Sequence, residues 1–437
     1  MKKGLVLLLV IVLAMTMLLV ACNQDSEAKA TPSEGLNFNS NGDGTCYVSG
    51  IGECTDTDIV IPAVSPDGDR VISIGKLAFC DCTGMASVTI PNSVTSIERS
   101  AFLRCTGLSS ITIPKSVISV VGLAFAGCSG LESITVSKGN TVYHSENNCL
   151  IETKTNTLIA GCKTSVIPDT VTSIGGYAFD GCTGLTVMSI PDSVTSISVQ
   201  AFDGCSGLES ITVSEGNTVY HSTNNCLIET NTNTLVIGCK NSVVPDSITS
   251  IGDRAFCGRT GLTGIMLPNG LTSIGAGAFI RCTGLTSITI PDSVTSIGDG
   301  AFRDCAGLTG IMLPDGLTSI GAGAFIRCTG LTNITIPDSV TSIGDGAFRD
   351  CIGLTSIIFP EGVTCIGEQV FQGCTGLTSI IIPDSLTSIS SNAFHDCDSL
   401  TDVYFTGNEQ EWAAIEDIKK NQPLKNATIH YNYVPEE

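Results

Sequence analysis

The chain has 437 residues, enough for several ordinary domains or for one long array of repeats. Its 42 Asp and Glu residues outnumber 21 Lys and Arg, which argues against a general nucleic-acid binder, because such proteins need a basic surface. Only 14% of the residues are charged and 5% are aromatic, and the prominence of Gly, Ser, Thr and Ile favours short strands and turns over long helices.

The N-terminus has the features of an export signal. Lys2 and Lys3 precede an apolar run over residues 4–21 that is too short and wrongly flanked for a comfortable membrane span. The run ends in "LVAC" at residues 19–22, which resembles the lipobox of bacterial lipoproteins. This resemblance implies a signal peptide over 1–21, lipid on the sulfur of Cys22, and a protein exported to the outer face of the cell envelope. A plain secretory signal or a membrane anchor is the alternative.

Two segments separate this signal from the regular part of the chain. Residues 22–43 are polar and contain Pro, Gly and Ser, so we expect a flexible tether that starts at the lipidated Cys22. Residues 44–81 contain "DIVIP" and "VISIGKLAF" with six extra residues between them. This irregular first unit is expected to cap the array that follows.

Residues 82–399 are an array of repeats. Phenylalanines recur every 23 residues between Phe79 and Phe394, apart from two intervals of 54. A cysteine follows each of these phenylalanines by three positions, except in one unit, where Arg259 takes the place. Such periodicity is the signature of a stacked solenoid, in which each unit completes the core of its neighbour.

A typical unit is "LTSITIPDSVTSIGDGAFRDC" over residues 285–305. The alternation in "LTSITIP" predicts a strand with its Ile residues inward and its Ser and Thr residues outward, and Pro291 ends it. "GDGAFRDC" predicts one tight or helical turn that buries Phe302. We therefore predict a right-handed, β-solenoid-like array, mostly β with short helical turns, with one parallel strand per 23-residue unit.

The unit pattern, LxxIxIPxxVxxIGxxAFxxCxx, resembles the BspA-type leucine-rich repeat of bacterial and protist surface proteins. The resemblance implies a leucine-rich repeat horseshoe with parallel strands on one face, displayed at the cell surface. It also implies adhesion to host matrix and plasma proteins, coaggregation or engagement of host receptors.

Two units carry inserts of 31 residues, at about 137–167 and 214–244, that are near copies of each other. Each is expected to form a hairpin. If the first turn centres on 155–156, the thiols of its two strands lie opposite each other, and they could form a disulfide or remain free; the possible pairs are Cys149–Cys162 and Cys226–Cys239. His144 and His221 lie nearby, but one His and two Cys fall short of the four usual zinc ligands, so no metal site is predicted.

Residues 400–437 depart from the period and are expected to form a C-terminal cap that shields the last rung. Residues 409–419 have helical composition and contain Trp412, the only tryptophan. The segment "ATIHYNY" that follows predicts a strand.

The repeated polar and thiol positions offer little chemistry. The cysteines beside Phe and Leu are expected to be buried, soft hydrophobes, because no base or electropositive group recurs near them. An acid follows the proline of most units and could attract Ca²⁺, but Pro-Asp is ordinary turn chemistry. The chain has four histidines and no phosphate-binding or catalytic motif, so we predict neither enzymatic activity nor a cofactor.

The outward side of the strands is the expected working surface. Its side chains are mainly Ser and Thr in the early units and become apolar later, at Met266, Met312, Ile358, Ile381 and Tyr404. Aligned apolar side chains can mark a partner site. Alternatively, the cap covers Ile381 and Tyr404.

These observations support a non-catalytic surface lipoprotein that binds an extracellular protein or glycan, with membrane contact only through its lipid. A scaffold or spacer of the cell envelope without a dedicated ligand is the alternative. The sequence does not identify the ligand.

Overall fold

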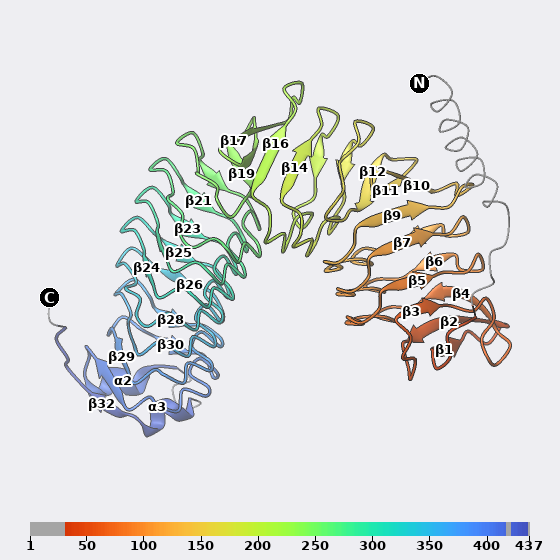
Figure 1. Cartoon of the computed structure of the whole chain (residues 1–437). Coiled ribbons are helices and arrows are strands. Elements are labelled where there is room, and N and C mark those ends of the chain that lie inside the picture. The colour runs from red at the N-terminus through yellow and green to blue at the C-terminus, as the bar shows by residue number, and fades with distance from the viewer. Residues whose placement is uncertain (1–30, 417–420, 436–437) are drawn as a thin grey trace, which may run out of the picture.

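The computed structural model describes residues 31–416 and 421–435. Over these residues the chain winds into a curved solenoid with the outline of an arch, and the first and last units stand in opposite arms (Figure 1). The solenoid and its curvature confirm the predicted fold. The expected signal peptide and Cys22 lie outside the described residues.

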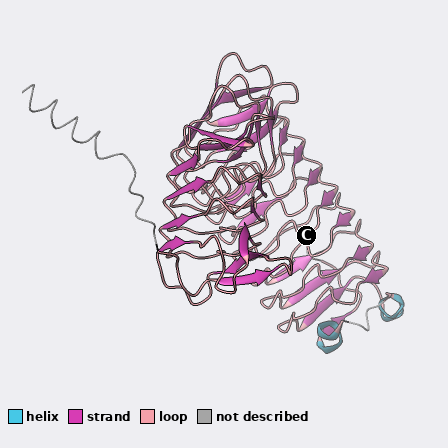
Figure 2. Ribbon diagram, turned by 90° about the vertical axis from the view of Figure 1, so that its right-hand side faces the viewer, coloured by secondary structure: helices cyan, strands magenta, loops and turns pink. Residues whose placement is uncertain are grey.

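Most regular units contribute two short parallel strands, whereas the sequence predicted one. The first is the predicted "SITI" strand, and the second is the two-residue "SI" segment after the proline turn. Both pair in register with the same residues of the next unit, as in Ser287↔Gly310 and Ser296↔Ser319. Figure 2 shows strands stacked along the solenoid and helices only at one end.

The first series of strands forms what we call the strand face. Its members are β3 (Asp58–Val60), β5 (Ser87–Thr89), β7 (Ser110–Ile113), β9 (Ser133–Val136), β14 (Val187–Ile190), β16 (Ser210–Val213), β22 (Ser287–Thr289), β24 (Gly310–Met312), β27 (Ser356–Ile358), β29 (Ser379–Ile382) and β31 (Asp402–Phe405). The second series comprises β4 (Arg70–Ile74), β6 (Ser96–Ile97), β8 (Ser119–Val120), β13 (Ser173–Ile174), β15 (Ser196–Ile197), β20 (Ser250–Ile251), β21 (Ser273–Ile274), β23 (Ser296–Ile297), β25 (Ser319–Ile320), β26 (Ser342–Ile343), β28 (Cys365–Ile366) and β30 (Ser388–Ile389).

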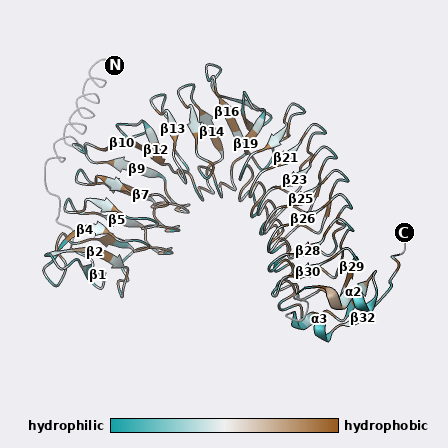
Figure 3. Ribbon diagram, turned by 180° about the vertical axis from the view of Figure 1, so that it is seen from behind, coloured by the Kyte–Doolittle hydropathy of each residue, from teal (hydrophilic) through white to brown (hydrophobic). Residues whose placement is uncertain are grey.

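The "AFxxC" segments form hydrogen-bonded turns, without the predicted helical turn, along the inner side of the arch (Figure 1). Their phenylalanine rings stack from rung to rung with centroids 5.0–5.6 Å apart and planes within 11°. In nine units the thiol of the repeat cysteine donates to the phenylalanine carbonyl of the preceding unit, as Cys305 does to Phe279 at 3.0 Å. Hydrophobic residues are concentrated in the strands, whereas the C-terminal helix of residues 422–426 is hydrophilic (Figure 3).

Each insert forms three antiparallel strands rather than a hairpin of two. They are β10 (Tyr143–Glu146), β11 (Cys149–Glu152) and β12 (Thr157–Ala160), and then β17 (Tyr220–Thr223), β18 (Cys226–Glu229) and β19 (Thr234–Gly238). β12 and β19 join the second series of parallel strands. Gly161 occupies the place of a phenylalanine, and a Cβ there would lie 2.1 Å from the Phe179 ring. The inserts therefore interrupt the ring stack and divide the core into three clusters.

Of the two alternatives for the insert cysteines, the structure has the free thiols: Cys149, Cys162, Cys226 and Cys239 are all buried and unpaired. A β-bulge in each insert shifts the register, so that Cys226 lies opposite Gly238 rather than Cys239. In the first insert, Cys149 packs in one core cluster and Cys162 in the neighbouring one. The two thiols of an insert thus face different parts of the core.

Both ends differ from the predicted boundaries. β1 (Asn37–Ser40), inside the predicted tether, pairs antiparallel with β2 (Thr45–Gly50), and the adjacent Leu36 is buried in the first core cluster. At the other end, β31 keeps the repeat register, so the cap begins after Phe405.

The cap itself consists of α2 (Glu409–Ala414), α3 (Gln422–Asn426) and β32 (Thr428–His430). Trp412 packs edge-on against Phe405 at 5.2 Å, so the cap covers the last rung of the core as predicted. Among the residues that the structure describes, no helix is long and apolar enough to cross a membrane.

The ring stack generates a stability prediction. Phe302 is fully buried between Phe279 and Phe325, so Phe302→Ala should lower the free energy of unfolding by about 3–5 kcal/mol. Phe302→Leu, which keeps most of the apolar volume, should lower it by less than about 1.5 kcal/mol. Urea denaturation followed by circular dichroism measures both values. An alanine variant as stable as the parent would contradict the role of the stack.

The buried thiols generate a second prediction. Burial raises the pKa of the Cys305 and Cys351 thiols to about 12, so both stay protonated and unreactive at pH 8 to 9. Native protein treated with iodoacetamide at pH 8 should therefore react first at the exposed Cys365, then at the half-buried Cys54, Cys80 and Cys82. Mass spectrometry should find the other thiols modified only after denaturation. Rapid native labelling at Cys305 would refute this order.

Candidate ligand-binding surface

The five predicted binding residues lie in one row on the strand face. Pairing places Thr289 beside Met312, Ile358 beside Ile381, and Ile381 beside Tyr404. Each rung contributes one outward side chain to this row, which we call the outward row. Met266 and Met312 stand two rungs apart, with Thr289 between them, whereas Ile358, Ile381 and Tyr404 are on consecutive rungs.

Exposure separates these five residues into two groups. Met266, Met312 and Ile358 are 88%, 70% and 49% exposed. Ile381 and Tyr404 are half-buried. The Tyr404 ring stacks on His430 of β32 at 4.6 Å and contacts Tyr433 at 4.7 Å. The cap therefore covers Tyr404, which agrees with the alternative that the cap shields the last outward residues. Met266, Met312 and Ile358 present the exposed apolar surface.

The sequence analysis missed two members of the outward row. Val243 is 65% exposed and stands one repeat length before Met266, while Val166 holds the matching position in the first insert. Val166 and Val243 stand two residues before a proline, as Met266 and Met312 do. Alignment on that proline would have found them. The exposed apolar residues Val243, Met266, Met312 and Ile358 are called the apolar stripe below.

A shallow groove of about 500 Å³ borders Met266, between its rung and β22. Residues 263–267 form no strand, so the pairing of the strand face is interrupted there. Gly264 stands where most units have Ser, and no heavy atom lies within 4 Å of the position of a Cβ on it. The missing side chain and the missing pairing together leave space beside an unbranched, adaptable methionine.

The apolar stripe can bind by burial of its surface but provides no reactive group. Methionine at an exposed site adapts its shape to varied partners, and the surrounding Ser and Thr hydroxyls supply hydrogen bonds. The stripe residues carry no charge. Such a surface suits a macromolecule with a complementary apolar patch.

Other chemically conspicuous residues have structural roles. Arg259, which replaces the repeated cysteine, is 1% exposed and donates to the carbonyls of Gly238, Phe202 and Cys257 at 2.8–3.1 Å. It fills the core where the second insert removes a phenylalanine. His144 hydrogen-bonds Thr153 at 2.9 Å. Within residues 31–416 and 421–435, no three His, Cys, Asp or Glu side chains converge as metal ligands would.

Comparison with known proteins gives consistent results. The chain matches the description "BspA type Leucine rich repeat region" in six copies, over residues 54–166, 159–239, 228–351 and 318–430. A leucine-rich repeat protein from Eubacterium ventriosum is 24% identical, with a TM-score of 0.55, over 84% of this chain and 94% of that chain. The pneumococcal vaccine antigen PcpA is 17% identical, with a TM-score of 0.51, over 92% and 98%.

A leucine rich cell surface protein from Faecalibacterium prausnitzii is 28% identical over 90% of this chain and 98% of that chain, with a TM-score of 0.43. No curated protein matches the sequence significantly. The matched residues span most of the array, and both the repeat pattern and the solenoid agree with the match. The chain therefore belongs to the BspA-type leucine-rich repeat family.

Proposed function

We propose that this protein is a lipid-anchored surface protein that binds an extracellular protein or glycan partner through the strand face. The observation that carries the proposal is the apolar stripe, whose Met266 and Met312 side chains are 88% and 70% exposed. Its alignment on the rungs and the groove beside Met266 support a binding surface rather than scattered exposure. Membership of a family with relatives described as cell-surface proteins supports the location.

The binding proposal is tested with a double variant, Met266→Asp with Met312→Asp. A charge at two apolar contacts opposes desolvation, so retention of a partner should fall at least about tenfold. The mature chain is immobilised and offered extracellular-matrix, plasma and bacterial-surface proteins, and retained proteins are compared between variant and parent. Both methionines are exposed, so the fold should persist in circular dichroism.

Thr112→Asp is the matched control, because Thr112 lies at the same outward position in the opposite arm. A partner retained by the parent and equally by the double variant would remove the apolar stripe from consideration. If the parent retains no protein at all, the alternative gains support: a scaffold or spacer of the cell envelope without a dedicated ligand.

Lipid attachment is tested separately. Cys22 ends the "LVAC" segment, so Cys22→Ser should abolish incorporation of labelled palmitate, because the thioether to lipid cannot form. Globomycin, which blocks lipoprotein signal cleavage, should cause the precursor of the parent protein to accumulate. An unlabelled parent protein that is freely secreted would contradict the lipid anchor.

A further inference from the structure

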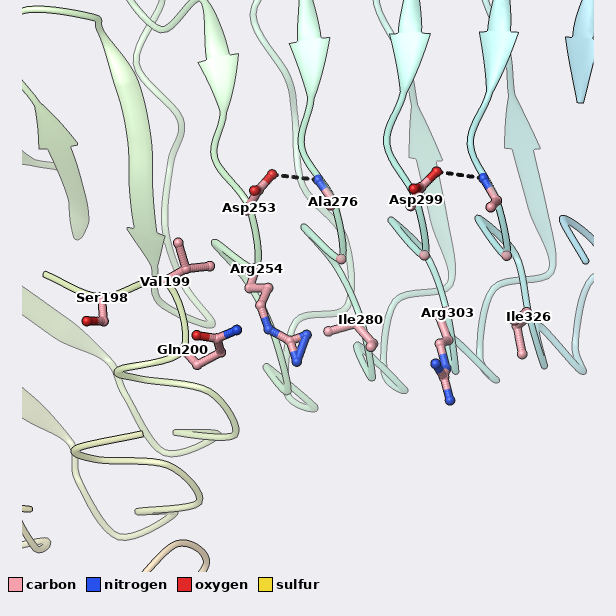
Figure 4. Close-up of a pocket in the computed structure, with 14 residues that line it drawn as sticks. Ser198, Val199, Gln200, Asp253, Arg254, Ala276, Ile280, Asp299, Arg303 and Ile326 are labelled. Atoms are coloured by element: carbon pink, nitrogen blue, oxygen red, sulfur yellow. Dashed lines mark hydrogen bonds between the residues drawn. The ribbon is translucent and has the colours of Figure 1, made fainter. Parts of the chain in front are cut away.

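A second, larger hollow lies on the inner side of the arch, away from the strand face. It is a trough of about 780 Å³ that runs across successive "AFxxC" turns (Figure 4). Its floor is formed by the residue two positions before each phenylalanine. That residue is a glycine at Gly277, Gly300 and Gly323 in the trough, and the run of glycines continues to Gly346 in the next unit.

The backbone does not require glycine at this position. The four glycines have φ of +60° to +63°, in the left-handed region that favours glycine. Yet Leu77, Ser100 and Gln369 hold the same position in other units at φ of +58° to +61°. The run of four glycines therefore creates open space rather than meeting a local need of the turn. Arg254 and Gln369 hold this position on either side of the glycine run, and beyond Arg254 the trough is lined by Ser198, Val199 and Gln200.

The two walls of the trough alternate in character from rung to rung. On one rung Asp299 and Arg303 line opposite sides of the trough (Figure 4), and on the next rung Ala322 and Ile326 line it. One oxygen of Asp299 accepts the Ala322 backbone N–H at 2.7 Å, which fixes the carboxylate. The Arg303 side chain is 45% exposed. Acceptors on one wall and donors on the other thus alternate with apolar contacts.

The spacing of this alternation is set by the ring stack beneath it. The Phe279–Phe302 and Phe302–Phe325 centroid distances are 5.3 Å and 5.4 Å, so the pattern repeats about every 10.7 Å. Two residues of an extended strand advance only about 6.6–6.8 Å. Three residues of a polyproline II helix advance about 9.3 Å. Neither of these peptide repeat lengths matches the 10.7 Å repeat of the trough.

The trough is also electrically balanced. Its charged lining residues are Asp253, Asp299, Arg254 and Arg303, so two negative charges offset two positive charges. Arg327 lies 3.6 Å from both Asp304 and Asp350, which extends this balance along the array. A strongly acidic or basic chain would gain no net attraction here, whereas an uncharged polar chain would.

We propose that the trough binds an extended, uncharged glycan of β-1,4-linked pyranoses. Sugar hydroxyls both donate and accept hydrogen bonds, so they match a wall of carboxylates that faces a wall of guanidinium groups. The apolar faces of the rings pack on Ile280 and Ile326. In an extended β-1,4-linked chain the sugar orientation alternates, and one disaccharide advances by nearly two rungs. The trough is separate from the apolar stripe, so this inference adds a second ligand to the proposed function.

Calorimetric titration of the mature chain with cello- and chito-oligosaccharides tests the inference. Affinity should rise from the disaccharide to the tetrasaccharide, because the run of glycines from Gly277 to Gly346 extends over four rungs, and change little from there to the hexasaccharide. Absence of binding by either hexasaccharide would overturn the proposal. So would an affinity that is independent of length.

Gly300→Gln should close the floor and weaken hexasaccharide binding at least tenfold. The nearest heavy atom to a Cβ at Gly300 is the Arg303 Cβ at 3.8 Å, and Gln369 already adopts the same φ, so the turn can accept this side chain. Ser100→Gln, at the matching position in the other arm, is the control and should bind as the parent does. Thermal denaturation confirms that both variants are folded.

Equal binding by folded Gly300→Gln and parent would overturn the site. Arg303→Ala, which removes the donor wall on one rung without filling the floor, should also weaken binding. The Met266→Asp and Met312→Asp double variant should bind the hexasaccharide as the parent does. Failure of the glycan proposal can thus be distinguished from failure of the proposal for the apolar stripe.

Discussion

The structure depends on the stacking of each phenylalanine on its copy in the next unit. A 23-residue unit cannot enclose its own apolar face, so each rung is completed by its neighbours. Phe302, with no exposed surface, shows how completely this happens. The thiol-to-carbonyl bond from Cys305 to Phe279 then joins the same two units through the backbone. Together these contacts fix the distance between rungs. Outward side chains on successive rungs are therefore separated by the same distance.

The inserts show what happens when this contact is absent. Where Gly161 and Gly238 replace a phenylalanine, the ring stack stops and the core separates into clusters. At the second interruption the buried guanidinium of Arg259 fills the space and donates hydrogen bonds to the carbonyls of Gly238 and Phe202. Beside the first insert the repeat cysteine is kept, and Cys182 donates to the Gly161 carbonyl as Arg259 does to that of Gly238.

The regular part of the fold follows from the sequence because its signal is repeated many times. The strand of residues 287–289 alternates apolar and polar residues, and the 23-residue period gives its register directly. The second strand was missed because the two residues Ser296–Ile297 are too few to show any period. The expectation that the two thiols of each insert lie directly opposite each other was wrong, because a β-bulge shifts the pairing by one residue. The amino-acid sequence of the hairpin gives no sign of that bulge.

The candidate surfaces were predictable only in part. Sequence periodicity placed Met266 and Met312 outward, and both are exposed. It did not reveal that Tyr404 is covered, because its contact with His430 joins the array to a cap that obeys no period. Nor did it reveal the trough, because glycine in a turn is usually attributed to backbone conformation. Only the side chains of Ser100 and Gln369 at the same φ show that conformation does not demand it.

The division of charge along the second half of the array extends this reasoning. Between residues 241 and 418 the positively charged residues are all arginines in or next to an "AFxxC" segment. The charged residues of the proline turns are all acidic. In a repeat protein, packing between neighbouring units constrains the core residues. Two sides of the molecule can therefore differ only through the few outward-facing residues of each unit. The inner side combines both charges with a run of glycines, while methionine and isoleucine replace some of the Ser and Thr residues of the strand face. Two sides of one solenoid therefore differ in chemistry although their units share one core, which is the condition for two ligands of different kinds.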